Sequence, residues 1–132
     1  MLEVRFYEEI DDTLLQFAVI VSRYKGKWVF CKHKERTTYE CPGGHREPGE
    51  AIEAAARREL YEETGAAAFS LTRLCAYGVS SGSKETFGML YYAEITALDA
   101  LPEAFEMEKI LLTDTLPESW TYPEIQPKLM QK

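Results

Sequence analysis

Short apolar runs in the first third of the chain indicate β-strands. Residues 13–24 (TLLQFAVIVSRY) are mostly apolar and rich in β-branched side chains, which favours a buried strand. A turn is predicted at residues 24–27, after which residues 28–32 alternate between the two faces of a second strand. The two runs together predict a hairpin.

Glycine and proline divide the next part of the chain. The segments 42–44 (PGG) and 48–49 (PG) predict breaks in regular structure. Residues 50–64 are strong helix formers, and Gly65 stands where a helix C-cap is expected. The sequence therefore predicts one well-defined helix that is entered through a glycine-rich loop.

The second half of the chain is expected to consist mainly of strands. We predict a strand at 69–77, a polar loop at 78–85, a strand at 87–95, an acidic loop at 98–109, a short strand at 109–113 and a helix at 123–131. Pro127 is compatible with that last helix only in its first turn. Strands mixed with one strong and one weaker helix predict a single α/β domain around a mixed sheet, over residues 1–132.

One face of the predicted helix at 50–64 changes from apolar to acidic along its length. At about 100° per residue, the side that should pack on the sheet is apolar in the first turns, with Ile52, Ala55, Ala56 and Leu60. Glu59 and Glu63 fall in the middle of this same face, and Glu62 lies at its edge. Because an unpaired buried carboxylate costs on the order of several kcal/mol, these groups must be paired, protonated or bound to metal.

Composition excludes several protein classes. The 132 residues suit one domain, and 45% hydrophobic with 28% charged residues exclude collagen-like, mucin-like and wholly disordered chains. The longest uncharged run, 13–22, is much shorter than the roughly 20 apolar residues of a membrane-spanning helix. Acidic residues near the N-terminus argue against a signal peptide. We therefore expect a cytoplasmic protein without membrane association.

Net charge and cysteine content further restrict the classes of binding partner and the state of the thiols. The net charge of −7 disfavours duplex nucleic acid, because an acidic surface repels the phosphate backbone. A small phosphorylated substrate is still compatible when a metal ion inverts the local charge. Cys31, Cys41 and Cys75 are widely spaced and form no Cys-x-x-Cys pair, so we expect reduced and mostly buried thiols.

The acidic face of the predicted helix favours a divalent metal site. Glu59, Glu62 and Glu63 have the spacing i, i+3, i+4 and project from one side. Carboxylates without cysteine or histidine are hard oxygen donors, which are typical of Mg²⁺ or Mn²⁺ sites. On charge pattern alone, a solvated acidic face with ordinary ion pairs is the alternative.

The loop before the helix excludes one class of nucleotide-binding protein. Gly44 and Gly49 have the spacing of the glycines in a phosphate-binding P-loop. Glu50 and Ala51 stand where that motif requires lysine and then serine or threonine. A kinase or ATPase of the P-loop type is therefore excluded.

Residues 44–66 (GHREPGEAIEAAARRELYEETGA) resemble the Nudix box G-x5-E-x7-R-E-U-x-E-E-x-G-U, where U is a bulky aliphatic residue. Every glycine and charged position of the box is filled, and only Ala66 is smaller than usual. The resemblance implies a Nudix hydrolase, which cleaves a nucleoside diphosphate linked to another group X. It also implies an α/β/α sandwich fold, dependence on divalent metal (usually Mg²⁺, with Mn²⁺ as the alternative) and no organic cofactor.

The resemblance implies roles for individual residues of the box. Glu59, Glu62 and Glu63 would bind the metal, with the backbone carbonyl of Gly43 or Gly44 as a further ligand. Arg58 would hold a glutamate of the box by a charge-assisted hydrogen bond. Glu50 would support the junction between loop and helix.

Hydrolysis of a phosphoanhydride also needs a general base beside the attacking water. Glu59 is the candidate within the box. Glu106 is the candidate from the acidic loop, chosen over Glu103 and Glu108. For these three loop residues, an ordinary surface position is the alternative.

The flanking residues are similar to the Nudix branch that acts on nucleoside triphosphates, including 8-oxo-dGTP. The similarity lies in residues 28–33, 39–44 and 116–118. Enzymes of this branch release a nucleoside monophosphate and pyrophosphate, so a small nucleotide is the expected substrate. His45 replaces the usual lysine and is a candidate for a weaker or pH-dependent phosphate contact.

A pocket for the base needs a polar group that reads its edge and an aromatic surface. Gln126 is the candidate for the polar group. Phe17, Tyr91 and Tyr122 are candidates for the aromatic surface, but packing in the core is the favoured interpretation of all three.

Other functions stay open at this point. An RNA 5′ pyrophosphohydrolase would need a basic strip along its substrate path, and basic residues do gather on the early hairpin and the loop after it: Arg23, Lys25, Lys27, Lys32, Lys34 and Arg36. A solvated edge that discourages strand pairing is the favoured explanation of this cluster. ADP-ribose is another candidate substrate, and a nucleotide-binding sensor is the non-enzymatic alternative. We expect a monomer or a homodimer.

Overall fold

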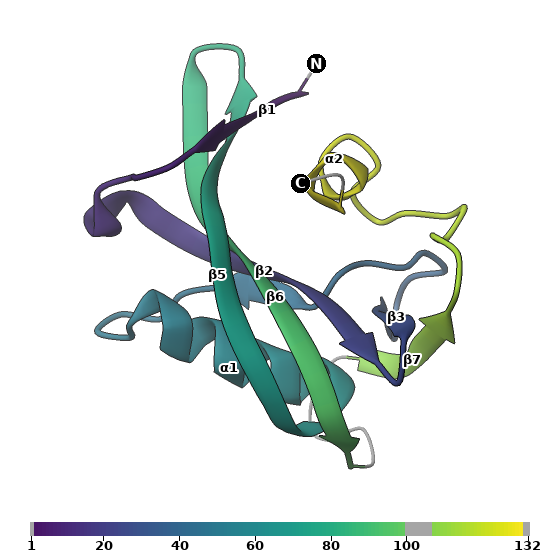
Figure 1. The fold of residues 1–132 in the computed structure, drawn as a ribbon. Coiled ribbons are helices and arrows are strands. Elements are labelled where there is room, and N and C mark those ends of the chain that lie inside the picture. The colour runs from purple at the N-terminus through teal and green to yellow at the C-terminus, as the bar shows by residue number, and fades with distance from the viewer. Residues whose placement is uncertain (1, 100–106, 131–132) are drawn as a thin grey trace.

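The computed structural model describes residues 2–99 and 107–130 (Figure 1). Its elements, in chain order, are β1 (Leu2–Tyr7), the 3-10 turn η1 (Asp12–Leu14), β2 (Leu15–Tyr24), β3 (Lys27–His33), β4 (Gly43–His45), α1 (Ile52–Thr64), β5 (Ala66–Ser81), β6 (Lys84–Leu98), β7 (Met107–Thr113) and α2 (Gln126–Met130). Within these ranges the strands form one seven-stranded sheet of order β1-β5-β6-β2-β3-β7, with β4 paired to β2 beside this path. The sheet is mixed because β2 and β6 run parallel, whereas the other pairs are antiparallel.

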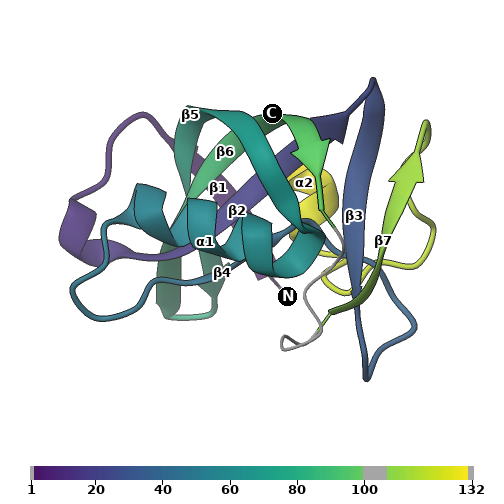
Figure 2. The same cartoon turned by 90° about the horizontal axis from the view of Figure 1, so that it is seen from below.

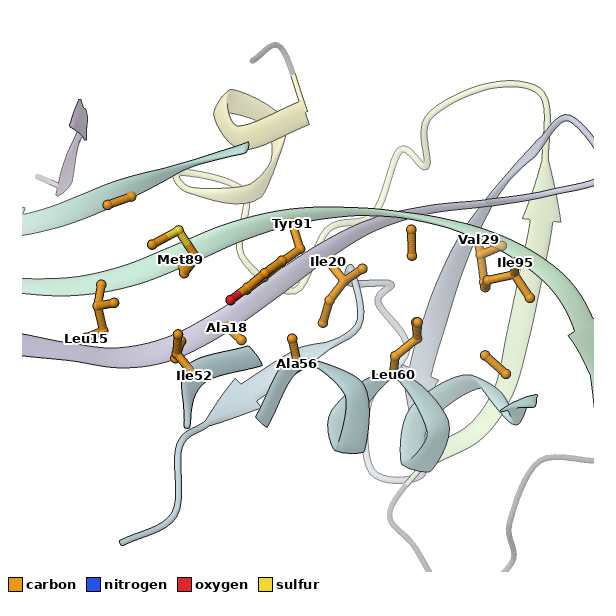
Figure 3. Close-up of a cluster of buried hydrophobic side chains, with 13 residues drawn as sticks. Leu15, Ala18, Ile20, Val29, Ile52, Ala56, Leu60, Met89, Tyr91 and Ile95 are labelled. Carbon is orange, nitrogen blue, oxygen red and sulfur yellow. The ribbon is translucent and has the colours of Figure 1, made fainter. Parts of the chain in front are cut away.

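The two helices lie on opposite sides of this sheet (Figures 1 and 2). On the α1 side, Ile52, Ala56 and Leu60 pack against Ile20 and Tyr91 of the sheet (Figure 3). On the α2 side, a second cluster joins Leu129 of α2 to buried residues of four strands, including Val21, Phe30, Tyr77 and Leu90. The sheet between α1 and α2 confirms the predicted α/β/α sandwich.

Helix α1 follows the sequence prediction closely. It begins at Ile52, two residues after the predicted start, and ends at Thr64. Gly65 has φ 80° and donates its N–H to the carbonyl oxygen of Tyr61 at 2.8 Å. This left-handed conformation is readily adopted by glycine, so the predicted C-cap is confirmed.

The polar loop predicted at residues 78–85 is wrong. β5 continues to Ser81 and β6 begins at Lys84, and the two strands pair up to a tight turn at Gly82 and Ser83. The polar side chains there belong to a partly exposed pair of antiparallel strands. Their polar composition is typical of a loop and therefore gave no sign of this pairing. β1, which the sequence did not predict, pairs with this same stretch of β5.

The break predicted at 42–44 is also only partly right, because Gly43–His45 form the short strand β4 against β2. A Cβ atom on Gly43 would collide with the carbonyl oxygen of Ala18. Glycine therefore permits the close backbone approach that this pairing requires.

The remaining predictions concern the C-terminal third. β7 confirms the strand predicted at 109–113 and begins earlier, at Met107. Glu103 and Glu106 lie outside the described residues, and the side chain of Glu108 is not among those described. The C-terminal helix is shorter than predicted, at Gln126–Met130, and Pro127 lies in its first turn as required. In the described ranges, neither helix combines the length and apolar character needed to cross a membrane.

Candidate functional site

Arg58 connects the loop before α1 to the acidic face of that helix. Its Nε and Nη2 atoms donate to the two carboxylate oxygens of Glu50 at 2.8 and 2.9 Å. Its Nη1 donates to Oε1 of Glu59 at 2.7 Å, and Nη2 also reaches the carbonyl oxygen of His45 at 3.1 Å. Hydrogen bonds from Arg58, followed by one from the Glu47 N–H, lower the pKa of Glu50 to about 2. The guanidinium therefore fixes the loop and one box glutamate together.

Glu59 lies directly against the glycine-rich loop. A Cβ atom added to Gly44 would stand 2.6–2.8 Å from the carboxylate atoms of Glu59. Burial raises the pKa of Glu59, while the hydrogen bond and charge of Arg58 act in the opposite direction. Gly44 thus leaves the space that this carboxylate occupies.

Glu63 binds the same loop one residue earlier. The Gly43 N–H donates to Oε1 of Glu63 at 2.8 Å, and the Cys31 thiol lies 3.9 Å from the same oxygen. Burial raises the pKa of Glu63 to about 9, with a further contribution from the charges of Glu59 and Glu40. Two partly buried carboxylates therefore face one short loop, and the Glu59 carboxylate adds to the rise in the pKa of Glu63.

The third glutamate, Glu62, lies 3.6 Å from Nη1 of Arg58 through its Oε2 atom. In residues 2–99 and 107–130, no three acidic, histidine or cysteine side chains converge into a preformed metal cage. The donor set nevertheless fits a divalent cation, because Glu59 and Glu63 are partly to mostly buried oxygen donors whose mutual repulsion a cation would relieve. The geometry thus supports the predicted grouping of these residues and leaves their role in metal binding a proposal.

Glu40 is a buried acidic residue that sequence reasoning missed. It is 7% exposed, and its Oε1 atom has no hydrogen-bond partner in the described structure. Arg36 is 3.5 Å from that atom, and burial raises the pKa of Glu40. No motif marks this residue, because it becomes buried only when its backbone pairs with Cys31 of β3.

A cavity of about 240 Å³ opens beside the glycine-rich loop on the α2 side of the sheet. Gly43, Gly44 and His45 form one wall. The other walls come from β2, β5, β6, the two residues before the loop and the C-terminal segment: Phe17, Ala18, Val19, Glu40, Cys41, Tyr77, Val79, Thr86, Tyr122, Ile125 and Gln126. Most of this lining is apolar or aromatic, which suits a flat ring.

The candidate base-contacting residues separate into two groups. Phe17, Tyr122 and Gln126 line the cavity, whereas Tyr91 is 1% exposed in the core against α1. The core interpretation holds for Tyr91 and is wrong for Tyr122, which is 40% exposed. Gln126 is buried, and its Oε1 atom accepts the Cys41 N–H at 2.7 Å.

His45 is exposed and lies edge-on to Phe17, with ring centroids 4.5 Å apart. It also borders a wider surface hollow of about 700 Å³ at the start of α1. Neither hollow is lined by Glu59, Glu62 or Glu63. The smaller cavity is the better candidate site because its wall includes Gly43 and Gly44, which lie against Glu63 and Glu59, whereas the wider hollow lacks both glycines.

The cysteines agree with the prediction of reduced, mostly buried thiols. Cys31 and Cys41 are buried, Cys75 is partly buried, and none of the three forms a disulfide bond. Burial raises the pKa of the Cys41 thiol to about 12, so packing explains this residue.

Comparison with known proteins identifies relatives. "Putative 8-oxo-dGTP diphosphatase YtkD" of Bacillus subtilis (strain 168) is 40% identical over 100 residues, which are 76% of this chain and 63% of that protein. An ADP-ribose pyrophosphatase of the same organism is 38% identical over 96 residues, 70% of this chain and 51% of that one. The matched regions thus span less than two thirds of these two relatives.

A solved structure and a protein-family model each match most of the chain. The crystal structure of the Bacillus subtilis pyrophosphohydrolase BsRppH (E68A mutant) aligns with a TM-score of 0.78 and 30% identity, over 98% of this chain and 89% of that one. The NUDIX domain model matches residues 12–120, a range that contains the whole box from Gly44 to Ala66. The chain therefore belongs to the Nudix family.

Proposed function

We propose that this chain, as one Nudix unit over residues 1–132, hydrolyses a nucleoside or deoxynucleoside triphosphate to the monophosphate and pyrophosphate, with 8-oxo-dGTP as the leading candidate. One observation carries the proposal: Glu59 and Glu63 contact the Gly43–Gly44 segment, and the same segment is a wall of the apolar cavity. A single nucleotide could therefore bind with its base in the cavity and its phosphates at the glutamates. The 40% identity to a protein named as an 8-oxo-dGTP diphosphatase supports this substrate.

Glu59, Glu62 and Glu63, with the carbonyl of Gly43 or Gly44, are the residues that would hold Mg²⁺, with Mn²⁺ as the alternative. When bound, such an ion neutralises phosphate charge and lowers the pKa of a bound water. The chain contributes oxygen donors on a rigid helix, and the Gly43 N–H fixes the orientation of Glu63.

The remaining polar groups have separate tasks in this proposal. Arg58 orients Glu59 through the hydrogen bond at 2.7 Å, and this contact supports Glu59 as the group that would accept a proton from the attacking water. Glu106 is the second candidate for general base. His45, at the cavity wall, is the candidate for a phosphate contact, and Gln126 is the candidate for a contact to the base edge.

RNA 5′ pyrophosphohydrolysis is the second candidate function, and it is compatible with the match of nearly the whole chain to a structure named as a pyrophosphohydrolase. The basic hairpin gives it little support: Arg23 stacks on Trp28 at 4.0 Å, and Lys27 pairs with Asp114 at 3.1 Å. These contacts agree with a structural role for both cations. ADP-ribose is a further candidate substrate, through the relative that is 38% identical.

The proposed substrate is a small cytoplasmic nucleotide, and a substrate panel tests it. The panel compares ordinary and 8-oxo (deoxy)nucleoside triphosphates, ADP-ribose and triphosphorylated RNA with Mg²⁺ at mildly alkaline pH, and it resolves the products by chromatography. We expect 8-oxo-dGTP to give the highest kcat/KM. Preferential turnover of RNA would replace the proposed substrate, and nucleotide binding without turnover of any compound would favour the sensor.

A further inference from the structure

Gln126 is a buried residue at the start of α2 whose side chain binds backbone far away in the sequence. It is 5% exposed, and its Oε1 atom accepts the Cys41 N–H at 2.7 Å. Cys41 itself is 1% exposed, so its N–H has no access to solvent. Because a buried N–H without a partner is costly, this hydrogen bond is a strong local constraint.

The bond acts at a defined point of the glycine-rich loop. Just before Cys41, Glu40 exchanges backbone hydrogen bonds with Cys31 at 2.9 and 3.0 Å. Just after it, the carbonyl oxygen of Pro42 accepts the N–H of Ile20 at 2.9 Å. Two residues after Cys41, the Gly43 N–H donates to Glu63. Gln126 therefore holds Cys41, which lies between these two backbone contacts and two residues before the contact of Gly43 with α1.

The loop is held from both sides of the sheet. α1 reaches it through Glu59 and Glu63, and α2 reaches it through Gln126. Gly43 and Gly44 are also paired with β2 as part of β4, and the Gln126 contact fixes Cys41 in the segment that enters this pairing. Loss of the α2 contact would leave the Cys41 N–H unsatisfied and allow the following glycines to shift.

We propose that Gln126 is a positioning residue for metal binding. By holding the Cys41 N–H it keeps the Gly43 N–H on Glu63 and keeps the Gly43 and Gly44 carbonyls in one place. The inference rests on the proposed function, since it takes Glu63 and one of these carbonyls as metal ligands. It gives Gln126 a task that is distinct from contact with the base and is measurable without any nucleotide.

Binding of Mn²⁺ to the nucleotide-free protein, followed by electron paramagnetic resonance, tests this task. Gln126→Leu removes the acceptor at similar volume and should raise the Kd for Mn²⁺ about 10-fold, at the lower end of what outer contacts to metal sites contribute. Gln126→Glu keeps an oxygen acceptor and should restore binding close to the wild-type value. Leu129→Ala, which weakens the α2 packing but keeps the Gln126 side chain and its acceptor, is the matched control and should leave the Kd unchanged.

Each outcome decides the question. An unchanged Kd in Gln126→Leu, or an equal loss in Leu129→Ala, would overturn the positioning role, because the effect would then be absent or merely structural. If Gln126→Leu does not fold, Gln126→Ala removes the same acceptor without adding an apolar branch. If the wild-type protein binds no Mn²⁺, the proposed function fails and this inference fails with it, whereas normal wild-type binding with an unaffected Gln126→Leu overturns the inference alone.

Discussion

Arg58 and Glu50 are joined by two hydrogen bonds, of 2.8 and 2.9 Å, across the junction between the glycine-rich loop and α1. Paired donors of this kind are specific to the planar guanidinium group. The same guanidinium holds Glu59 at 2.7 Å, so the loop, the helix and one proposed metal ligand form a single unit.

Arg58→Lys should therefore reduce kcat by about 10- to 100-fold, because an ammonium group cannot hold Glu50 and Glu59 in the same geometry. Steady-state hydrolysis of the best substrate measures the effect. Arg57→Lys is the matched control, since Arg57 forms an exposed ion pair with Glu53 at 3.2 Å on the same helix. Equal rates in the two variants would contradict the role given to Arg58.

Gly44→Ala should impair metal binding and activity while changing stability little. The added Cβ would stand 2.6–2.8 Å from the carboxylate of Glu59, which must move. At Gly43 the obstacle is instead the Ala18 backbone, so Gly43→Ala should mainly lower the melting temperature. Thermal melts and Mn²⁺ binding of both variants distinguish the two effects, and normal metal affinity in Gly44→Ala would count against Glu59 as a ligand.

The metal-free protein should lose stability as the pH rises from about 4.5 towards 9. Burial raises the pKa of Glu63 to about 9 from its ordinary value of 4.5, so the folded state keeps a proton that the unfolded state releases. The free energy of unfolding should fall by about 1 kcal/mol per pH unit in this window. Glu63→Gln mimics the protonated form and should be more stable than wild type at pH 8 but equal at pH 4.

Urea unfolding in the presence of EDTA measures that difference, with the exposed Glu53→Gln as control. Addition of Mg²⁺ should stabilise the wild type and leave Glu63→Gln unchanged, because only the wild type offers the carboxylate. The same pH dependence in both proteins would show that Glu63 titrates normally.

Phe17→Ala should raise KM for the nucleotide more than it lowers kcat. Phe17 lines the cavity next to His45, and its phenyl ring has no group that could transfer a proton. The substitution should therefore affect binding of the nucleotide's ring and not the proton transfer. Tyr91→Phe is the comparison, because Tyr91 lies in the core and should leave KM unaffected. A loss confined to kcat would place the base elsewhere.

The acidic helix was predictable because its information is local. Spacing alone places Glu59 and Glu63 on the inward face of α1, and Gly65 marks its end; the structure agrees on both points. The resemblance to the Nudix box also predicts that Arg58 holds one of its glutamates, and in the structure Arg58 donates to Glu59.

The parts that sequence reasoning missed depend on long-range pairing. The extension of β5 and β6 through residues 78–85 and the pairing of β1 arise between segments whose own composition is polar or mixed. Glu40 and the Gln126–Cys41 hydrogen bond depend on backbone brought together from distant positions. No periodicity within one segment carries that information.

The most direct test of the account is the product balance of 8-oxo-dGTP hydrolysis by wild type and Glu63→Gln. With Mg²⁺, the wild type should release one pyrophosphate for each monophosphate, and both EDTA and the substitution should abolish the reaction. Undiminished turnover in Glu63→Gln, or release of orthophosphate in place of pyrophosphate, would contradict the proposed site and the proposed cleavage.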